Sequence, residues 1–394
     1  MITTGVTGSR WRASITPWGA IEPADGSATL DWHVAADDRW HTPRDEANVR
    51  QKRLGGTAVV ETRLRVPEGD AVQRIYSVAE HGGLTIVEVE NASPLPIAVA
   101  FTRGDLLTVL PPTAPIEGIV LPAGSIAVPV GHKATVTVAF AHDGRGAGVL
   151  PAGLPSATAV VRGWTATAER ASRLLLPDAP AGPRVVAARC ELLLNGPAHP
   201  DDDQVAFLLG VADLVRMGHR AAEWVPDVAH ALEQAVKSGE RDWALAAAID
   251  AAAVVLQQAG ERRALNDLDA IRHRTQPDPR LPSTEPDEPA RMVAWHERRL
   301  AAPGGVLLPN GLPTGWEGTN FEVYGLPTGP ASTVSFAVRW HGARPAVLFE
   351  QSGTPVQLTA PVVAPEWSTA DTSGEVLWPV PPGLTPNTEP ASFS

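Results

Sequence analysis

The period of the hydrophobic pattern changes twice along this chain, and that order limits the fold more than any other feature. Residues 61–66, 73–78 and 84–90 alternate polar and apolar side chains, as half-buried strands do. From about residue 184 to 301 the apolar residues recur at helical spacing, and alternation returns at 333–340. Because strands and helices occupy separate blocks, a doubly wound parallel sheet is disfavoured. We therefore predict a multi-domain α+β chain.

Turn residues and changes of period divide the chain into four predicted parts. Residues 1–165 predict an N-terminal antiparallel β-sandwich, and residues 166–188, with a Pro- and Gly-rich run, are interpreted as a linker. Residues 189–302 predict a short α-helical bundle of about six helices. Residues 303–394 predict a β-rich C-terminal segment with a disordered tail. Further strands are expected at 97–102, 118–121, 126–130, 134–140 and around 323–326, and a hairpin is expected to join 333–340 to 346–350.

Charge and cysteine content disfavour several classes of partner. The chain has 44 acidic and 32 basic residues, a net charge of -12, which is unsuited to nucleic acid or to anionic membrane surfaces. No stretch approaches the roughly 18 apolar residues of a membrane span, and residues 1–9 do not resemble a signal peptide. Cys190 is the single cysteine, so no internal disulfide can form. We expect a cytoplasmic protein with no nucleic-acid and no membrane partner.

No motif in the sequence indicates a cofactor. The histidines lack the spacing of zinc ligands. The run Gly5-Val6-Thr7-Gly8-Ser9 lacks the lysine and the preceding strand of a phosphate-binding loop. A G-x-S-x-G nucleophile elbow is also absent from the sequence. We therefore expect neither a metal nor an organic cofactor.

The order of strands, linker and helices resembles a known family layout. The N-terminal strands 61–66 and 84–102, the run 315–328 and the run 334–348 carry this likeness to the six-hairpin glycosidases, which include glucoamylase-like hydrolases and disaccharide phosphorylases. The resemblance implies a catalytic α/α toroid of twelve helices, which needs roughly 190 residues or more. Residues 184–301 hold about half of that. We therefore expect a reduced relative with an incomplete toroid and no central cavity in which carboxylates could converge.

Glycoside hydrolysis requires two carboxylates roughly 5 to 10 Å apart. The best local pair is Glu317 and Glu322, which flank a Gly-Thr-Asn-Phe segment. Asp203, the last of three consecutive aspartates, is a candidate partner acid, although capping of the following helix is an alternative interpretation. If the chain is an enzyme, we expect these three acids to be catalytic.

Indole rings can stack on sugar rings or fill a hydrophobic core. Trp316 precedes Glu317, an arrangement suited to a sugar whose ring lies on the indole while the acid binds its hydroxyls. Trp40 and Trp340 are further candidates for substrate binding, with core packing as the alternative. Three functional hypotheses follow: a carbohydrate-binding or scaffold protein without turnover, an active carbohydrate hydrolase or phosphorylase with a site between domains or subunits, and a structural assembly subunit. An oligosaccharide, a protein partner or a second copy are the expected partners.

Overall fold

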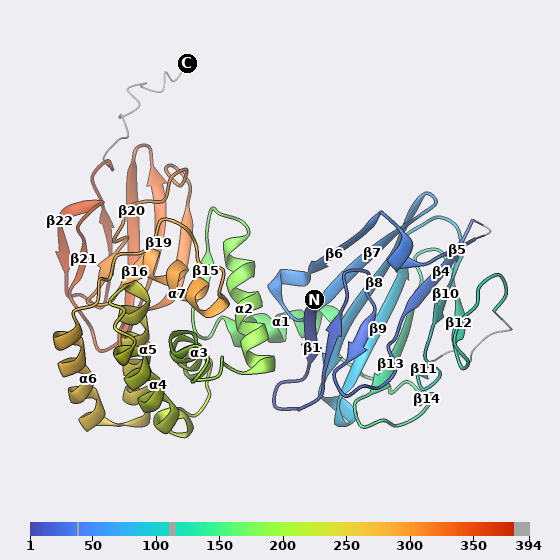
Figure 1. The fold of residues 1–394 in the computed structure, drawn as a ribbon. Helices are drawn as coiled ribbons and strands as arrows, with labels where there is room; N and C mark the ends of the chain where they lie inside the picture. The colour runs from blue at the N-terminus through green and yellow to red at the C-terminus, as the bar shows by residue number, and fades with distance from the viewer. Residues whose placement is uncertain (38, 110–115, 382–394) are drawn as a thin grey trace, which may run out of the picture. The chain divides into compact units, whose positions relative to one another are not determined.

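The computed structural model describes residues 1–37, 39–109 and 116–381. Two compact units are present: unit 1 comprises residues 1–166 with 193–195, and unit 2 comprises residues 167–192 and 196–394 (Figure 1). Within the described residues there are seven α-helices and five sheets, and the helices form no closed barrel. The prediction of a mixed α+β chain is confirmed.

Unit 1 is built from three sheets. The smallest has the order β1-β2-β3, with β1 at Ile2–Gly5, β2 at Arg12–Ile15 and β3 at Ile21–Pro23. A four-stranded sheet has the order β12-β10-β4-β5, and a seven-stranded sheet has the order β14-β11-β13-β9-β8-β7-β6. Their strands are β4 (Trp32–Ala36), β5 (Arg39–His41), β6 (Val49–Arg53), β7 (Val60–Val66), β8 (Gly69–Val78), β9 (Leu84–Asn91), β10 (Ile97–Phe101), β11 (Leu107–Thr108), β12 (Ile126–Val130), β13 (Thr135–Ala141) and β14 (Gly148–Val149).

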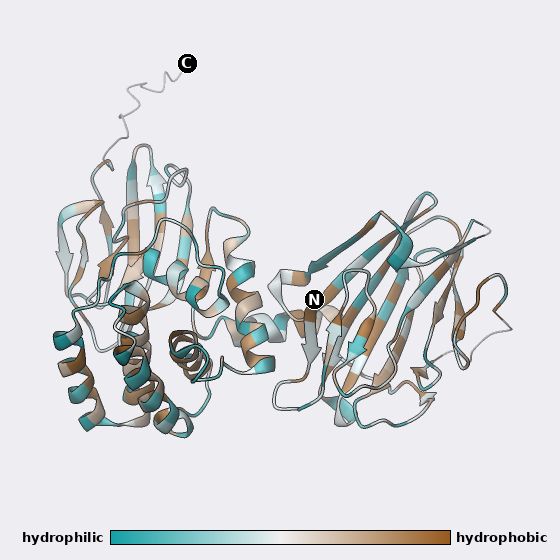
Figure 2. Ribbon diagram, viewed as in Figure 1, coloured by the Kyte–Doolittle hydropathy of each residue, from teal (hydrophilic) through white to brown (hydrophobic). Residues whose placement is uncertain are grey.

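The two larger sheets share one hydrophobic core. Trp32 and Phe101 from the four-stranded sheet belong to the same buried cluster as Leu64, Ile75 and Val138 from the seven-stranded sheet. Apolar and polar residues alternate along these strands (Figure 2), because one face of each strand meets the core. On its other face the seven-stranded sheet carries a second apolar cluster, which helix α1 (Ala157–Ala168) helps to cover.

Most of the predicted strands of unit 1 are present, but one is not. The segments 61–66, 73–78, 84–90, 97–102, 126–130 and 134–140 coincide with β7, β8, β9, β10, β12 and β13. Residues 118–121 form no strand: Gly118 has a positive φ of 80° and Val120 is fully exposed. Two consecutive β-branched residues indicated a strand there, but among the described residues no strand pairs with them.

Six helices follow in the region where about six were predicted. They are α2 (Ala181–Asn195), α3 (Gln204–Arg216), α4 (Val225–Lys237), α5 (Trp243–Ala259), α6 (Arg262–Thr275) and α7 (Pro289–Leu300). Acidic N-caps start three of them, because Asp203, Asp242 and Glu288 accept hydrogen bonds from backbone N–H groups of α3, α5 and α7. Helix α5 ends at Gly260, whose left-handed conformation with φ of 77° suits glycine.

Unit 2 also contains two sheets. One has the order β15-β18-β19-β20-β23 and the other has the order β16-β17-β21-β22. Their strands are β15 (Arg173–Leu175), β16 (Ala301–Ala302), β17 (Val306–Leu307), β18 (Phe321–Gly329), β19 (Ser332–His341), β20 (Arg344–Gly353), β21 (Leu358–Ala360), β22 (Ala364–Thr369) and β23 (Ser373–Leu377). The predicted hairpin is confirmed, with Trp340 opposite Pro345 beside its turn. The strand expected around 323–326 is the longer β18.

The helices and the five-stranded sheet of unit 2 pack on each other. Met292 and Val293 of α7 lie in the same buried cluster as Val323, Phe336 and Val347 of the sheet. The segment interpreted as a linker, 166–188, contains β15 and the start of α2. The tail end that was predicted to be disordered falls on residues 382–394, which lie outside the described residues. Within the described chain, none of the helices has both the length and the apolar content to cross a membrane.

Candidate functional site

Unit 2 contains a pocket of about 550 Å³ between its helices and the β18–β19 hairpin, a size typical of small-molecule sites. Each of four helices contributes residues spaced i, i+3, i+4 and i+7, which place them on one helical face. These stripes are Leu209, Ala212, Asp213 and Arg216 on α3, Ala247, Asp250, Ala251 and Val254 on α5, Leu265, Leu268, Asp269 and Arg272 on α6, and Ala290, Val293, Ala294 and Glu297 on α7.

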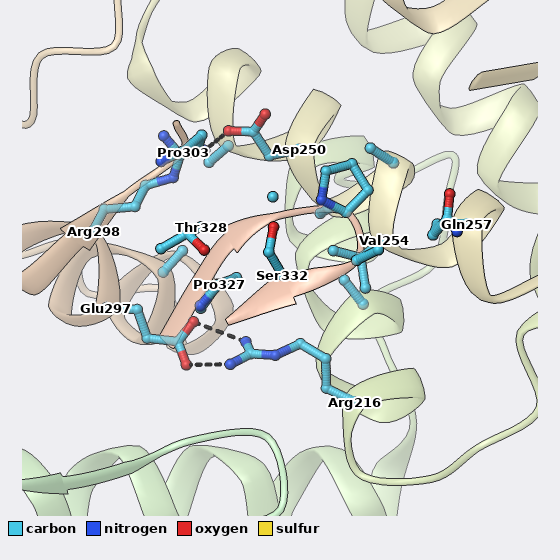
Figure 3. A pocket seen from close by; sticks show the side chains of 18 of the residues that line it. Arg216, Asp250, Val254, Gln257, Glu297, Arg298, Pro303, Pro327, Thr328 and Ser332 are labelled. Atoms are coloured by element: carbon cyan, nitrogen blue, oxygen red, sulfur yellow. Dashed lines mark hydrogen bonds and ion pairs between the residues drawn. The ribbon is translucent and has the colours of Figure 1, made fainter. Parts of the chain in front are cut away.

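Small side chains leave the space open. The Ala-rich face of α5 and the alanines of α3 and α7 keep the helices from filling the centre, and the hairpin turn Pro327–Ala331 lines another side (Figure 3). The expected incomplete ring is present, since the helices form no closed barrel, but a pocket exists beside them. The helices alone do not close a ring, but the β-hairpin supplies the missing wall.

One wall of the pocket carries a buried network of arginines and acids, which we call the inner cluster: Ser172, Arg189, Asp213, Arg216 and Glu297. Glu297 accepts hydrogen bonds from Ser172 Oγ at 2.5 Å, from Arg189 Nη2 at 2.7 Å and from Arg216 Nη1 at 2.8 Å. Asp213 accepts from Arg189 Nε at 3.0 Å and from Arg216 Nη1 at 3.0 Å. Two guanidinium groups thus balance two carboxylates, and the network joins α2, α3 and α7.

Backbone carbonyls accept other donors of the inner cluster. Arg189 Nη1 donates to Ser172 O at 2.8 Å, and Arg216 Nη2 donates to Ala171 O at 2.6 Å and to Gly325 O at 3.3 Å. Gly325 lies in a bulge of β18 with a positive φ of 68°, a conformation that glycine adopts without a steric cost. Most N–H donors of Arg189 and Arg216 therefore have an acceptor within the protein.

The electrostatics of the inner cluster favour the charged forms. Burial alone would raise the pKa of Glu297, but the charges of Arg216 and Arg189 outweigh burial and lower this pKa to about 2. Burial alone would lower the pKa of Arg216, but Glu297 and Asp213 outweigh burial and raise it. Glu297 therefore stays ionised at neutral pH and has no proton to donate, which makes it unsuited to the role of general acid.

A second group, which we call the outer cluster, consists of Asp250, Arg272 and Arg298. Asp250 Oδ1 lies 2.5 Å from Arg272 Nη2, and Asp250 Oδ2 accepts from Arg298 Nη2. Figure 3 shows Arg298 meeting Asp250 on one side of the pocket and Arg216 meeting Glu297 on another. Here one carboxylate faces two guanidinium groups, so the outer cluster has one surplus positive charge.

The three acids predicted to be catalytic already have local partners. Asp203 caps α3 and accepts from Arg291 at 2.6 and 2.8 Å, and these hydrogen bonds overcome the effect of burial and lower its pKa. Glu322 accepts from the Tyr324 hydroxyl and from Arg339, and both bonds lower the pKa of Glu322. Glu317 is exposed and accepts from Gly315 N–H at 2.9 Å.

The predicted tryptophans differ in exposure. Trp316 is buried and packs edge-to-face on Phe321 with ring centroids 5.0 Å apart. Trp340 is half-buried, and its Nε1 donates to Thr319 O at 3.0 Å, so it lies beside the loop that follows Glu317. Trp40 belongs to unit 1, is half-buried and donates to Glu117 O at 2.8 Å. Within the described chain, none of the six predicted site residues lines the pocket.

The pocket residues themselves were not predicted as a site. One signal was available, because the charged Asp250 interrupts the alanine-rich run of α5. Among the lining residues of the described chain there is no His, Cys, Lys or aromatic side chain. The described residues also contain no group of three or more His, Cys, Asp or Glu side chains that could hold a metal ion.

Comparison with known proteins gives no assignment. No protein-family model matches the chain, and no curated protein matches its sequence.

Proposed function

We propose that this chain binds a small apolar molecule in the pocket of unit 2 and does not transform it. The observation that carries the proposal is the pocket itself, about 550 Å³ and lined mainly by Ala, Val, Leu and Pro side chains. Apolar walls with a few polar groups are typical of ligand sites. The pocket reaches solvent, since its lining residues include the exposed Gln257 and Asp269.

Binding without turnover is favoured by the pairing of the carboxylates. Asp213, Asp250 and Glu297 each contact two arginines. A pair of carboxylates for glycoside hydrolysis needs one member that holds a proton near neutral pH, and the low pKa of Glu297 does not provide it. This agrees with the hypothesis of a binding protein without turnover.

The neutral fluorescent probe N-phenyl-1-naphthylamine tests the proposal. We expect it to bind the folded wild-type chain with increased fluorescence. Ala251 lines the pocket from α5, so Ala251→Phe should fill the space and abolish the signal. Ala270→Phe makes the same change at an exposed position of α6 that does not line the pocket, and should leave the signal intact. No signal in the wild type, or equal signals in all three proteins, would refute the proposal.

A second candidate function, carbohydrate binding, is favoured by the contacts around Trp340. Trp340 donates to the loop that follows Glu317, and Arg339 next to Trp340 pairs with Glu322. We therefore retain a sugar site at this loop as an alternative proposal. Quenching of tryptophan fluorescence by an oligosaccharide panel, lost in Trp340→Ala, would support it. If this site hydrolyses glycosides, Glu317→Gln and Glu322→Gln should abolish the activity, and unchanged rates would dismiss both residues.

The relation to six-hairpin glycosidases also stays a proposal. Two sheets around one core in unit 1 and six helices in the central region support an N-terminal β-sandwich followed by an incomplete α/α toroid. A reduced relative of this kind would retain a binding site while lacking the ring that positions catalytic acids.

A further inference from the structure

The outer cluster differs from the inner cluster in its unused hydrogen-bond donors. An arginine side chain has five N–H donors and no acceptor. In the described chain, Arg298 donates only through Nη2, to Asp250 and at 3.4 Å to Ala246 O. Arg272 Nη2 lies 2.5 Å from Asp250 Oδ1. The Nε and Nη1 groups of both arginines thus have no partner among the described residues.

The inner cluster shows what a purely structural arrangement looks like in the same unit. Arg189 donates through all three of its nitrogens to Asp213, Glu297, Ser172 and Ala168. Its side chain is 1% exposed, whereas that of Arg272 is 39% exposed. Arg298 is 11% exposed, so the shared difference from Arg189 lies in the spare donors of Arg298 and Arg272, which can bind a ligand.

The charges of the pocket wall indicate the charge of that ligand. The inner cluster pairs two guanidinium groups with two carboxylates, and the outer cluster has two guanidinium groups for Asp250 alone. Asp269, the other charged lining residue, is exposed and makes no ion pair among the described residues. With Asp269 counted, acids and arginines balance around the pocket, and the surplus positive charge is a local one beside Asp250, at Arg272 and Arg298.

The hydroxyl of Thr328 is a further polar group that a ligand oxygen could bind. Thr328 lines the pocket and is 1% exposed, and its Oγ1 has no hydrogen-bond partner in the described chain. Figure 3 places the hydroxyls of Thr328 and Ser332 between the Arg298–Asp250 pair and the Arg216–Glu297 pair. A buried hydroxyl without a partner is unfavourable, so a ligand oxygen that reached it would remove this cost.

We propose that the ligand is an apolar monocarboxylic acid whose carboxylate binds the free donors of Arg298 and Arg272, while its hydrocarbon part lies against the Ala, Val and Leu stripes. This inference rests on the proposed function of the pocket. A guanidinium group presents paired N–H donors that match the two oxygens of a carboxylate. One surplus positive charge matches a monoanion, and the apolar stripes match a hydrocarbon.

Three ligands with the same hydrocarbon chain test the inference: decanoic acid, decanol and decylamine at neutral pH, each displacing N-phenyl-1-naphthylamine. We expect decanoate to bind at least about tenfold more tightly than decanol, the ratio that about 1.4 kcal/mol produces. Decylamine should bind more weakly than decanol. If the naphthylamine probe does not bind, the pocket proposal fails and this inference fails with it. If the probe binds and the three ligands displace it equally, only the carboxylate assignment is overturned.

Two substitutions with opposite expected effects separate recognition from a merely structural role. Arg298→Gln should reduce the preference for decanoate to about that for decanol, while Asp250→Asn should increase it because both guanidinium groups are then free. Arg299→Gln changes the next residue of α7, which lies over Trp295 and does not line the pocket, and should leave the preference unchanged.

Arg272→Gln repeats the test on a more exposed side chain should Arg298→Gln fail to fold. A preference that persists in a folded Arg298→Gln or Arg272→Gln protein, or that falls in Asp250→Asn, would overturn the inference.

Discussion

The inner and outer clusters of unit 2 consist of the same charged residue types but differ in burial and in hydrogen bonding. In each, a carboxylate lies between two arginines: Glu297 between Arg189 and Arg216, and Asp250 between Arg272 and Arg298. The Glu297 side chain is 5% exposed and the Asp250 side chain is 20% exposed. Glu297 also accepts from a third group, the Ser172 hydroxyl, and its arginines also donate to backbone carbonyls.

The difference shows that composition alone does not define a site. Burial makes an unpaired charge costly, so a buried arginine is found with all its partners in place. Exposure lowers that cost at Arg272, which is 39% exposed, whereas Arg298, 11% exposed, borders the unfilled pocket. The inner cluster should therefore govern the stability of unit 2, and the outer cluster should govern what the pocket binds.

The largest expected effect comes from removing the inner carboxylate. Glu297→Ala leaves the buried Arg189 and Arg216 with Asp213 as their one remaining carboxylate, and the uncompensated positive charge should lower the free energy of unfolding by about 3–5 kcal/mol. Asp250→Ala makes the matched change in the outer cluster and should cost about 0–1 kcal/mol. Denaturant unfolding, followed by circular dichroism, measures both. Equal losses would show that the two clusters do not differ in the way their burial indicates.

Low pH should reduce the stability of the folded protein because it protonates Glu297 of the inner cluster. Its folded pKa of about 2 lies below the ordinary glutamate value of 4.5, so the unfolded chain binds more protons between these values. The stabilisation is complete above about pH 4.5 and is lost as the pH falls toward about 2, on the order of 3 kcal/mol in all. Unfolding curves at several pH values should show this loss in the wild type. Glu297→Gln, although less stable at pH 7, should lack that part of the dependence, and parallel curves for the two proteins would contradict the assignment.

Substitutions that add side-chain volume to α5, at the pocket or in the core, should have smaller effects on stability. Ala251 and Ala252 are consecutive in α5, but Ala251 lines the pocket while Ala252 is fully buried in the helical core. Leucine at position 252 should overpack that core and cost about 1–3 kcal/mol. Ala251→Leu places the same added carbons in the pocket and should change stability by less. Thermal unfolding of the two variants compares them, and similar losses would indicate that the pocket is closed in solution.

Local patterns made the strands and caps predictable from sequence. Alternation in residues 333–340 identified β19 because one face of that strand packs on the core, and Asp203 was recognised as a helix cap from its position before an apolar run. The same rule failed at residues 118–121, where three apolar residues follow a glycine but no strand of the described residues pairs with them. Strand formation there depended on a distant partner that local sequence does not specify.

The pocket was not predictable for a related reason. A stripe such as Leu209, Ala212 and Asp213 has the spacing of ordinary core packing, and only the distance to the opposite wall decides whether it faces other atoms or empty space. The length argument counted helices and concluded that an incomplete toroid has no central cavity. It did not consider that the β18–β19 hairpin contributes a wall, although β19 begins more than 70 residues after the end of α5.

The smallest effect concerns the coupling within the outer cluster. A double-mutant cycle of Arg272→Gln and Asp250→Asn isolates their interaction from the other effects of each change. Because Arg272 is 39% exposed, solvent screens the pair, and the coupling should be about 0.2–1 kcal/mol in stability. The same cycle measured on decanoate binding should show opposite signs for the two single variants, since one removes a donor to the ligand and the other frees one. A strong coupling in stability with no effect on binding would place Arg272 with the structural arginines of the inner cluster.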